Sequence, residues 1–255
     1  MSHKEKYITA SVILAIFLAW YGITEYSLVS DALVPSPKSV AAAFFSILSD
    51  DYKGISLWRH LSVSMIRLLT AFLLAALVAV PLGLASGYNS KIRAVFEPIV
   101  EFYRPLPPLA YYTLIILWMG IDDSSKITLL WLAAFAPMYI ACVSAMRMVK
   151  NDYVNSALTL GASKWQVFFY VSFPACLPGI FTGIRTAVGV AYTTLVAAEM
   201  VAAVSGIGWL VLDASRYLRS DIIFMGIFIM GITGITLDQA LRLLESKIVF
   251  WKGKE

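Results

Sequence analysis

The chain has 255 residues, of which 60% are hydrophobic and only 14% are charged, and its mean hydropathy is +0.78. Soluble domains have about a quarter of their residues charged, so this composition excludes a soluble protein and predicts one integral membrane domain. The net charge of +4 is small, and the Lys and Arg residues are scattered or fall between apolar stretches, which argues against nucleic-acid binding.

The first apolar stretch runs from Ile8 to Val29 after a short polar start. It has no clear small-residue cleavage site, so we interpret it as an uncleaved membrane span rather than a signal sequence. Two prolines then interrupt the chain, and residues 38–48 have the spacing of an amphipathic helix. Residues 1–59 are therefore expected to hold the first span and an amphipathic segment outside the membrane.

Five further apolar stretches follow, and the third span of the chain is interrupted by Arg104 and nearby prolines. A spanning helix needs about 20 mostly apolar residues, so we predict an all-α integral membrane protein with six transmembrane helices. Both the second and the fifth span contain glycines four residues apart, a spacing that allows close helix packing. The five stretches are residues 60–87, 95–120, 125–146, 175–203 and 222–241, with a partly helical connection expected at 205–221.

Residues 155–174, NSALTLGASKWQVFFYVSFP, lie between the fourth and fifth spans. Gly161 interrupts this stretch, Ser163 and Gln166 have the spacing of a capping box, and Pro174 is expected to end it. The pattern predicts two short helices joined by a sharp turn at Gly161.

The second of these helices has Trp165, Phe168 and Phe169 at helical spacing. A bent element with apolar faces, held outside the membrane by the flanking spans, is suited to docking into a groove of a partner. The alternative is a pair of interfacial helices resting on membrane lipid. Such helices usually carry several Lys or Arg residues, whereas this stretch has only Lys164, which favours docking.

Six spans place both termini on the same side of the membrane. If that side is cytoplasmic, it holds eleven Lys and Arg residues against six on the other side, as the positive-inside rule requires. The bent loop then lies in the cytoplasm and the amphipathic segment in the periplasm. The eleven are Lys4, Lys6, Lys91, Arg93, Arg147, Lys150, Lys164, Arg242, Lys247, Lys252 and Lys254, and the six are Lys38, Lys53, Arg59, Lys126, Arg216 and Arg219.

Several charged residues fall within or near the ends of the spans, where a charge at mid-bilayer costs roughly 2.5 to 3.5 kcal/mol. We expect them to face protein or water, either as paired struts between helices or as part of a solute pathway. Arg104 is the main pathway candidate, because an exposed guanidinium beside a helix break can bind an anionic group as a fork. Glu199, which can pair with an Arg or with a substrate ammonium, and Arg185 are further candidates. The full set is Arg67, Glu97, Glu101, Arg104, Arg185, Glu199 and Asp238.

The sequence lacks the GxxxxGK[ST] loop that binds nucleotide phosphates, so this chain is not expected to bind ATP. His3 and His60 lie far apart, which leaves no plausible zinc site. Cys142 and Cys176 lie in apolar stretches and are expected to be ordinary buried residues. No Ser-His-Asp or Cys-His arrangement is present at a plausible depth, so we expect no enzymatic activity and no cofactor in this chain.

Residues 155–174 resemble the EAA loop of ABC-transporter membrane subunits, in which an EAA triplet is followed four residues later by Gly and thirteen further on by Pro. Ala157, Gly161 and Pro174 stand at those places, while Asn155 and Ser156 replace the Glu and the first Ala. The segments EFYRPLPPLAYYTLIILWMGI, TLVAAEMVAA and SGIGWL are similar to those of importer permeases for taurine, sulfonates and nitrate, and most of all to taurine permeases. The resemblance extends from about residue 33 onward.

The resemblance implies a type I ABC importer (MetI-like) permease fold over residues 1–255, with a five-span core at 60–247 and a cytoplasmic coupling loop at 150–174. It implies a bacterial inner-membrane complex of two copies of this chain, two ATPase subunits that bind ATP and Mg, and a periplasmic solute-binding protein. Taurine is the expected solute, with other alkyl sulfonates, nitrate or a thiamine precursor as alternatives. The coupling-loop residues implied are Asn155, Ser156, Ala157, Gly161, Ala162, Trp165 and Pro174.

Two other classes of membrane protein compete with this interpretation. A secondary transporter driven by an ion gradient should show inverted repeats and carboxylates at the centre of broken helices, and no internal repeat is visible. An intramembrane enzyme is disfavoured because no paired catalytic residues are found.

Overall fold

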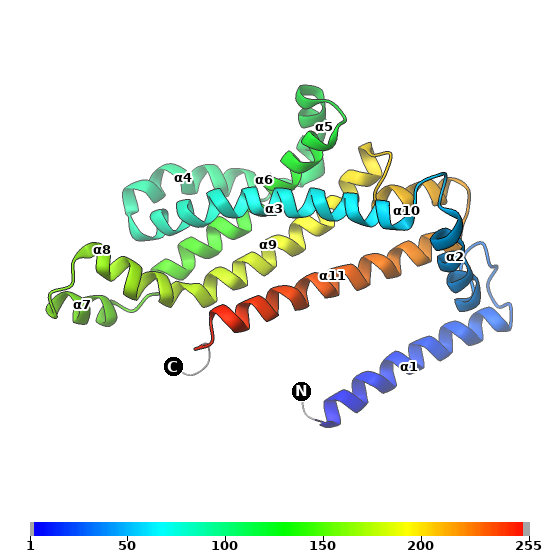
Figure 1. Cartoon of the computed structure of the whole chain (residues 1–255), viewed down its shortest axis with the longest axis horizontal. Coiled ribbons are helices and arrows are strands. Elements are labelled where there is room, and N and C mark those ends of the chain that lie inside the picture. The colour runs from blue at the N-terminus through cyan, green and yellow to red at the C-terminus, as the bar shows by residue number, and fades with distance from the viewer. Residues whose placement is uncertain (1–2, 252–255) are drawn as a thin grey trace. The chain divides into compact units, whose positions relative to one another are not determined.

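The computed structural model describes residues 3–251, which form helices and short connections (Figure 1). Lys252 and Lys254 of the basic tail lie outside the described residues, as do the side chains of His3, Lys4 and Lys6. The predicted all-helical class is confirmed over the described part of the chain. Its helices are α1 (His3–Glu25), α2 (Pro37–Asp50), α3 (Leu57–Tyr88), α4 (Ser90–Tyr103), α5 (Pro108–Met119), α6 (Asp123–Arg147), α7 (Asn151–Thr159), α8 (Lys164–Val167), the π-helical turn η1 (Phe168–Ser172), α9 (Phe173–Ala202), α10 (Ile207–Arg216) and α11 (Ser220–Ile248).

The predicted third span is not a continuous helix. Residues 104–107 separate α4 from α5, whose 12 residues are too few to cross a bilayer alone. The prolines at positions 105 and 107 lack the N–H that an α-helix needs, which explains the interruption. Within the described residues, five helical runs are long and apolar enough to span: Tyr7–Glu25, Leu57–Tyr88, Asp123–Arg147, Lys164–Ala202 and Ser220–Ile248. A sixth crossing, made by α4 and α5 together, stays a prediction.

The chain divides into two compact units, one formed by residues up to 63 with 204–232, the other by 64–203 with the segment from 233 onward. In the first unit, Ser36 caps α2 by accepting the N–H of Ser39 at 3.1 Å. The amphipathic helix predicted for residues 38–48 is confirmed, because α2 buries one face: Val40, Ala43 and Ile47.

A second contact in this unit joins the connection before α3 to α10. Asp213 accepts a hydrogen bond from Tyr52 at 2.9 Å and forms an ion pair with Lys53 at 2.7 Å. Burial alone would raise the pKa of the Asp213 carboxyl, but the bonds from Lys53 and Tyr52 outweigh it and hold that pKa below its ordinary value. Burial and the hydrogen bond to Asp213 raise the pKa of Tyr52 to about 12.

In the second unit, α3, α6 and α9 run side by side (Figure 1) and meet through glycines. A Cβ added to Gly83 of α3 would lie 2.6 Å from the Cβ of Cys142 and 2.8 Å from the carbonyl oxygen of Tyr139. A Cβ added to Gly179 of α9 would lie 2.6 Å from the Cβ of Ala145, also on α6. The close packing predicted from the glycine spacing is therefore confirmed on both sides of α6.

The two cysteines contribute to the same packing. Cys142 of α6 and Cys176 of α9 are buried and free, and the Sγ of Cys176 lies 3.9 Å from the Sδ of Met146. The prediction that they are ordinary buried residues is confirmed, and α6 is tightly enclosed at this level.

Candidate functional site

The bent loop between α6 and α9 is built by α7 and α8, and Gly161 lies at the turn between them. Gly161 has φ +87°. Its N–H donates to the carbonyl of Leu158 at 2.9 Å, and the N–H of Ala162 donates to the carbonyl of Ala157 at 3.1 Å. This hydrogen-bond pair is a Schellman motif, which ends a helix at a residue of positive φ. The sharp turn predicted at Gly161 is confirmed.

The capping box at the start of α8 follows the turn directly. The Ser163 hydroxyl accepts the N–H of Gln166 at 3.3 Å, and the Gln166 side chain accepts the N–H of Ser163 at 2.8 Å. Because the box is adjacent to the Gly161 turn, the two motifs together fix the direction in which α8 leaves α7.

Pro174 does not end the second helix of the loop, contrary to the sequence-based expectation. The chain stays helical from Lys164 to Ala202, passing from α8 through the π-helical turn η1 into α9. The N–H of Phe173 bonds the carbonyl of Phe168, the longer spacing of a π turn, and Pro174 falls in the first turn of α9. Proline is tolerated in the first turn of an α-helix, and single π turns occur inside longer helices. The loop is consequently continuous with the span that follows it.

The aromatic residues of the loop divide between anchoring and exposed positions. The Phe168 ring meets Tyr88 at the end of α3 edge-to-face, with centroids 5.5 Å apart. Trp165 stacks on Phe169 at 5.8 Å, and its side chain is 72% exposed. All three aromatic residues of the loop border an apolar groove of about 720 Å³, which is also lined by Pro81 of α3. Phe168 thus holds the loop against α3, while Trp165 and Phe169 present an apolar surface.

The first helix of the loop presents a polar surface instead. Asn155 and Ser156 are exposed, and they line a shallow hollow on one face of α7 with Asp152, Thr159 and Leu160. Ala157 is half-buried beneath them. The predicted coupling-loop residues on α7 and α8 therefore lie on either side of one bend, with Gly161 and Ala162 at its corner, whereas Pro174 lies beyond the loop in the first turn of α9.

Glu199, a predicted pathway candidate, is paired inside the second unit. It is 1% exposed and accepts hydrogen bonds from Arg67 at 2.8 Å and Ser64 at 2.7 Å, both on α3. Arg67 also binds Asp123 at the start of α6, at 2.6 Å. This network joins α3, α6 and α9, which is the arrangement expected of a strut between helices.

Arg185 is also paired. Its guanidinium lies 2.8 Å from Asp238 and 3.8 Å from Glu245, both on α11, and Asp238 binds Arg242 at 2.8 Å as well. A small cavity adjoins Arg185 and Asp238. The carboxylates around Arg185 satisfy its charge and connect α9 to α11.

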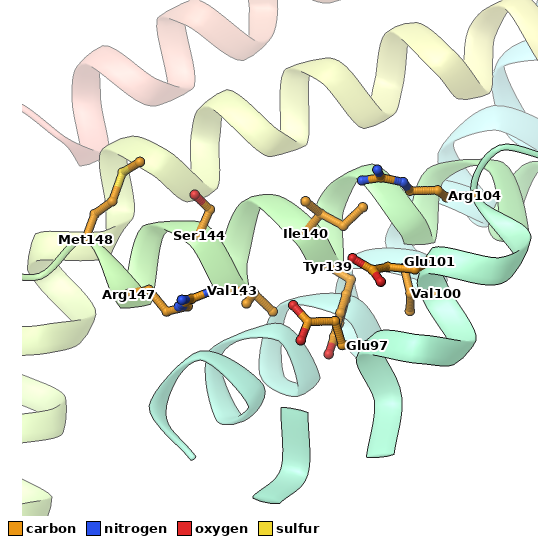
Figure 2. A pocket seen from close by; sticks show the side chains of 10 residues that line it. All are labelled: Glu97, Val100, Glu101, Arg104, Tyr139, Ile140, Val143, Ser144, Arg147 and Met148. Atoms are coloured by element: carbon orange, nitrogen blue, oxygen red, sulfur yellow. The ribbon is translucent and has the colours of Figure 1, made fainter. Parts of the chain in front are cut away.

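Arg104 is placed differently, at the C-terminal end of α4, where it lines a cavity of about 360 Å³ between α4 and α6. Figure 2 shows the charged ends along this cavity in the order Arg147, Glu97, Glu101, Arg104. Glu97 forms a loose ion pair with Arg93 at 3.6 Å. Across residues 3–251, no ion pair or side-chain hydrogen bond involves Arg104, Glu101 or Arg147.

A second cavity, of about 320 Å³, continues along α6 on the other side of Arg104 and is also lined by α5. Arg104 and Ile140 line both cavities. Sequence reasoning counted Glu97 and Glu101 among the membrane charges but did not place them at a site. Their spacing from Arg104, at i, i+4 and i+7, puts all three on one helix face and was the signal available.

Comparisons with known proteins give the chain its family. Residues 79–250 match the family described as binding-protein-dependent transport system inner membrane component. The taurine transport system permease protein of Escherichia coli (strain K12) is 36% identical over 247 residues, 96% of this chain and 89% of that protein. The putative aliphatic sulfonates transport permease protein of Bacillus subtilis (strain 168) is 34% identical over 244 residues, 95% of this chain and 86% of that protein.

A third relative is the nitrate import permease protein of Synechocystis sp., 32% identical over 224 residues, 85% of this chain and 80% of that protein. These relatives and the five apolar helical runs make the chain a multi-pass inner-membrane transport subunit. The resemblance to the taurine, sulfonate and nitrate permeases is confirmed. The chain therefore belongs to the family of binding-protein-dependent transport system inner membrane components.

Proposed function

We propose that this chain is the permease subunit of an ABC importer for a small organosulfonate, with taurine as the first candidate. The observation that carries the proposal is the bent element α7–α8, which exposes Trp165 and is continuous with α9. A partner that moves α8 moves the start of a membrane span with it. The relatives for taurine and aliphatic sulfonates support the solute class.

The proposed complex contains two copies of this chain, two ATPase subunits and a periplasmic solute-binding protein. ATP and Mg bind to the ATPase subunits, which dock on the polar face of α7 and the apolar face of α8. Both termini and the loop lie in the cytoplasm. Closure of the ATPase pair displaces α8 and, through it, α9.

The packing of α9 against α6 connects the proposed displacement of α9 to the cavity between α4 and α6. α9 contacts α6 closely where Gly179 meets Ala145. One helical turn or less from Ala145, α6 lines the charged cavity with Ser144 and Arg147. A shift of α9 therefore changes the cavity walls, and we propose that the pathway opens alternately to the two sides in this way. Among the candidate pathway residues, the unpaired Arg104 is assigned to the solute, and Arg185 and Glu199 to struts that keep the moving helices aligned.

Purification with the neighbouring gene products tests the importer class. We expect an ATPase subunit to co-purify with this chain, and a strain lacking the gene to lose growth on taurine as sole sulfur source while still growing on sulfate. An ion-driven secondary transporter would purify alone and retain uptake after ATP depletion. The same growth test with an alkyl sulfonate as sulfur source, and with nitrate as nitrogen source, distinguishes taurine from the solutes for which the other two relatives are named.

Reporter fusions test the orientation. A reporter active only in the cytoplasm should be active after Lys91 or Lys164, which follow α3 and open α8, and silent after Asp51 or Ser215. The Lys and Arg distribution gives the reason for this pattern. The reverse pattern would place α7–α8 outside the cytoplasm and would remove the proposed ATPase contact.

A further inference from the structure

We infer that the cavity between α4 and α6 is a site for a short zwitterion, at which Arg104 binds a sulfonate and Glu101 binds an ammonium. The permease itself then prefers an aminosulfonate to a plain anion of similar size. This inference rests on the proposed importer function and names the part of the chain that recognises its solute.

The spacing of the two charged groups matches a short solute. Glu101 and Arg104 are three residues apart at the end of α4, so they lie on the same face, with Cβ atoms about 5–6 Å apart. Both line the cavity, and no ion pair joins them in the described structure. A molecule with its two charges separated by two carbon atoms can therefore contact a carboxylate and a guanidinium at once.

The carboxylate of Glu97 strengthens the expected preference for a zwitterion over a plain anion. Glu97 lies one turn before Glu101 on the same face and is held by its loose pair with Arg93. A plain anion bound to Arg104 is repelled by both carboxylates, whereas a zwitterion places its ammonium among them. Discrimination by an unfavourable contact with the wrong ligand is a common source of specificity. Glu199 cannot replace Glu101 in this role, because Arg67 and Ser64 already bind its carboxylate in a buried position.

The proposed site lies where two cavities along α6 meet, as expected for a site on a solute pathway. The two cavities that meet at Arg104 and Ile140 follow one side of α6 from Leu132 to Met148, a helix rise of about 24 Å. The polar side chains Arg104, Glu101 and Arg147 are exposed in the single chain, where ion pairs are individually weak. A weak site at the junction lets the solute enter and leave again, which transport requires.

The test measures binding to the permease–ATPase complex in lipid nanodiscs, without the binding protein. Tritiated taurine is the probe, and unlabelled taurine and ethanesulfonate, which lacks the amine, are the competitors. We expect taurine to compete at roughly tenfold lower concentration than ethanesulfonate in the wild type, because its ammonium forms a charge-assisted hydrogen bond with Glu101 that the methyl group of ethanesulfonate cannot form. Glu101→Gln should bring the two competitors within about twofold, and Arg104→Gln should weaken both.

Lys91→Gln is the matched control, since Lys91 lies at the exposed start of α4 and outside the cavity. It should leave both competition curves unchanged. The inference is overturned if the wild-type complex does not bind taurine, if ethanesulfonate competes equally well, or if Glu101→Gln keeps the wild-type ratio. A complex that supports growth on taurine yet gives any of these results loses the assigned site and keeps the proposed function.

Discussion

Gly83→Leu should abolish folding of the permease. A single added Cβ at this position would already lie 2.6 Å from the Cβ of Cys142 and 2.8 Å from the backbone oxygen of Tyr139. The backbone of α6 cannot move aside easily, because Gly179 of α9 brings a second helix against the same segment. Overpacking typically costs about 1–3 kcal/mol and sometimes more, and Leu adds three further carbon atoms to the clash. Detergent-solubilised protein should lose its monodisperse peak in size-exclusion chromatography.

Gly231→Leu is the matched control for this substitution. Gly231 lies in α11, and a Cβ added there meets nothing within 4 Å. Leu is a better helix former than Gly, so this variant should fold at the wild-type level. If both variants give wild-type peaks, the contact between α3 and α6 is looser than described and the glycine spacing does not determine the packing.

Five of the long apolar helices and the turn of the loop could be predicted because their signals are local, whereas the predicted third span is divided into α4 and α5. Gly161 at the break, and Ser163 with Gln166 three residues apart, specify hydrogen bonds that close within six residues along the chain. The glycine pairs gave a weaker signal, since the spacing shows that a helix can be approached closely and not which helix approaches it. Only the structure identifies α6 as the partner of both α3 and α9.

The continuation of the helix through Pro174 and the partners of the charged residues could not be predicted, because they depend on contacts between distant parts of the chain or on a backbone geometry without a sequence motif. Pro174 normally marks a helix end, but the π turn before it keeps the helix continuous. The sequence alone does not distinguish Arg67, Glu199 and Arg104, because each is a charged residue within an apolar stretch. Their difference lies in their partners: Arg67 and Glu199 meet across α3 and α9, whereas Arg104 reaches a cavity. Sequence reasoning could list the charges, and tertiary contacts were needed to sort them.

Gly161→Val should leave the permease folded and inserted but uncouple it from the proposed ATPase subunits. Gly161 has φ +87°, a conformation that costs a residue with a Cβ roughly 1–2 kcal/mol and a β-branched residue more. Because no atom lies within 4 Å of an added Cβ, the effect comes from the backbone alone. Relaxing φ breaks the bonds to Leu158 and Ala157 and redirects α8.

The altered direction of α8 should be visible in ATP hydrolysis and in solute uptake. In reconstituted complexes, ATP hydrolysis by the Gly161→Val variant should no longer respond to solute-loaded binding protein. Taurine uptake should fall at least about tenfold, since Trp165 and Phe169 would no longer face the ATPase subunit on which we propose that they dock. Membrane levels of the variant should match the wild type, because the turn is exposed and contributes little to the packing of α6.

Two controls separate the direction of the turn from the loss of Gly itself. Asn adopts positive φ more readily than other residues with a side chain, so Gly161→Asn should retain most of the coupling. Lys164→Ala changes an exposed residue of α8 without altering the turn, and it should have little effect. Wild-type uptake and ATPase stimulation in Gly161→Val would show that α7–α8 is not the transmitting element. Equal loss in the Asn and Val variants would show that the turn's positive φ is not what the coupling requires.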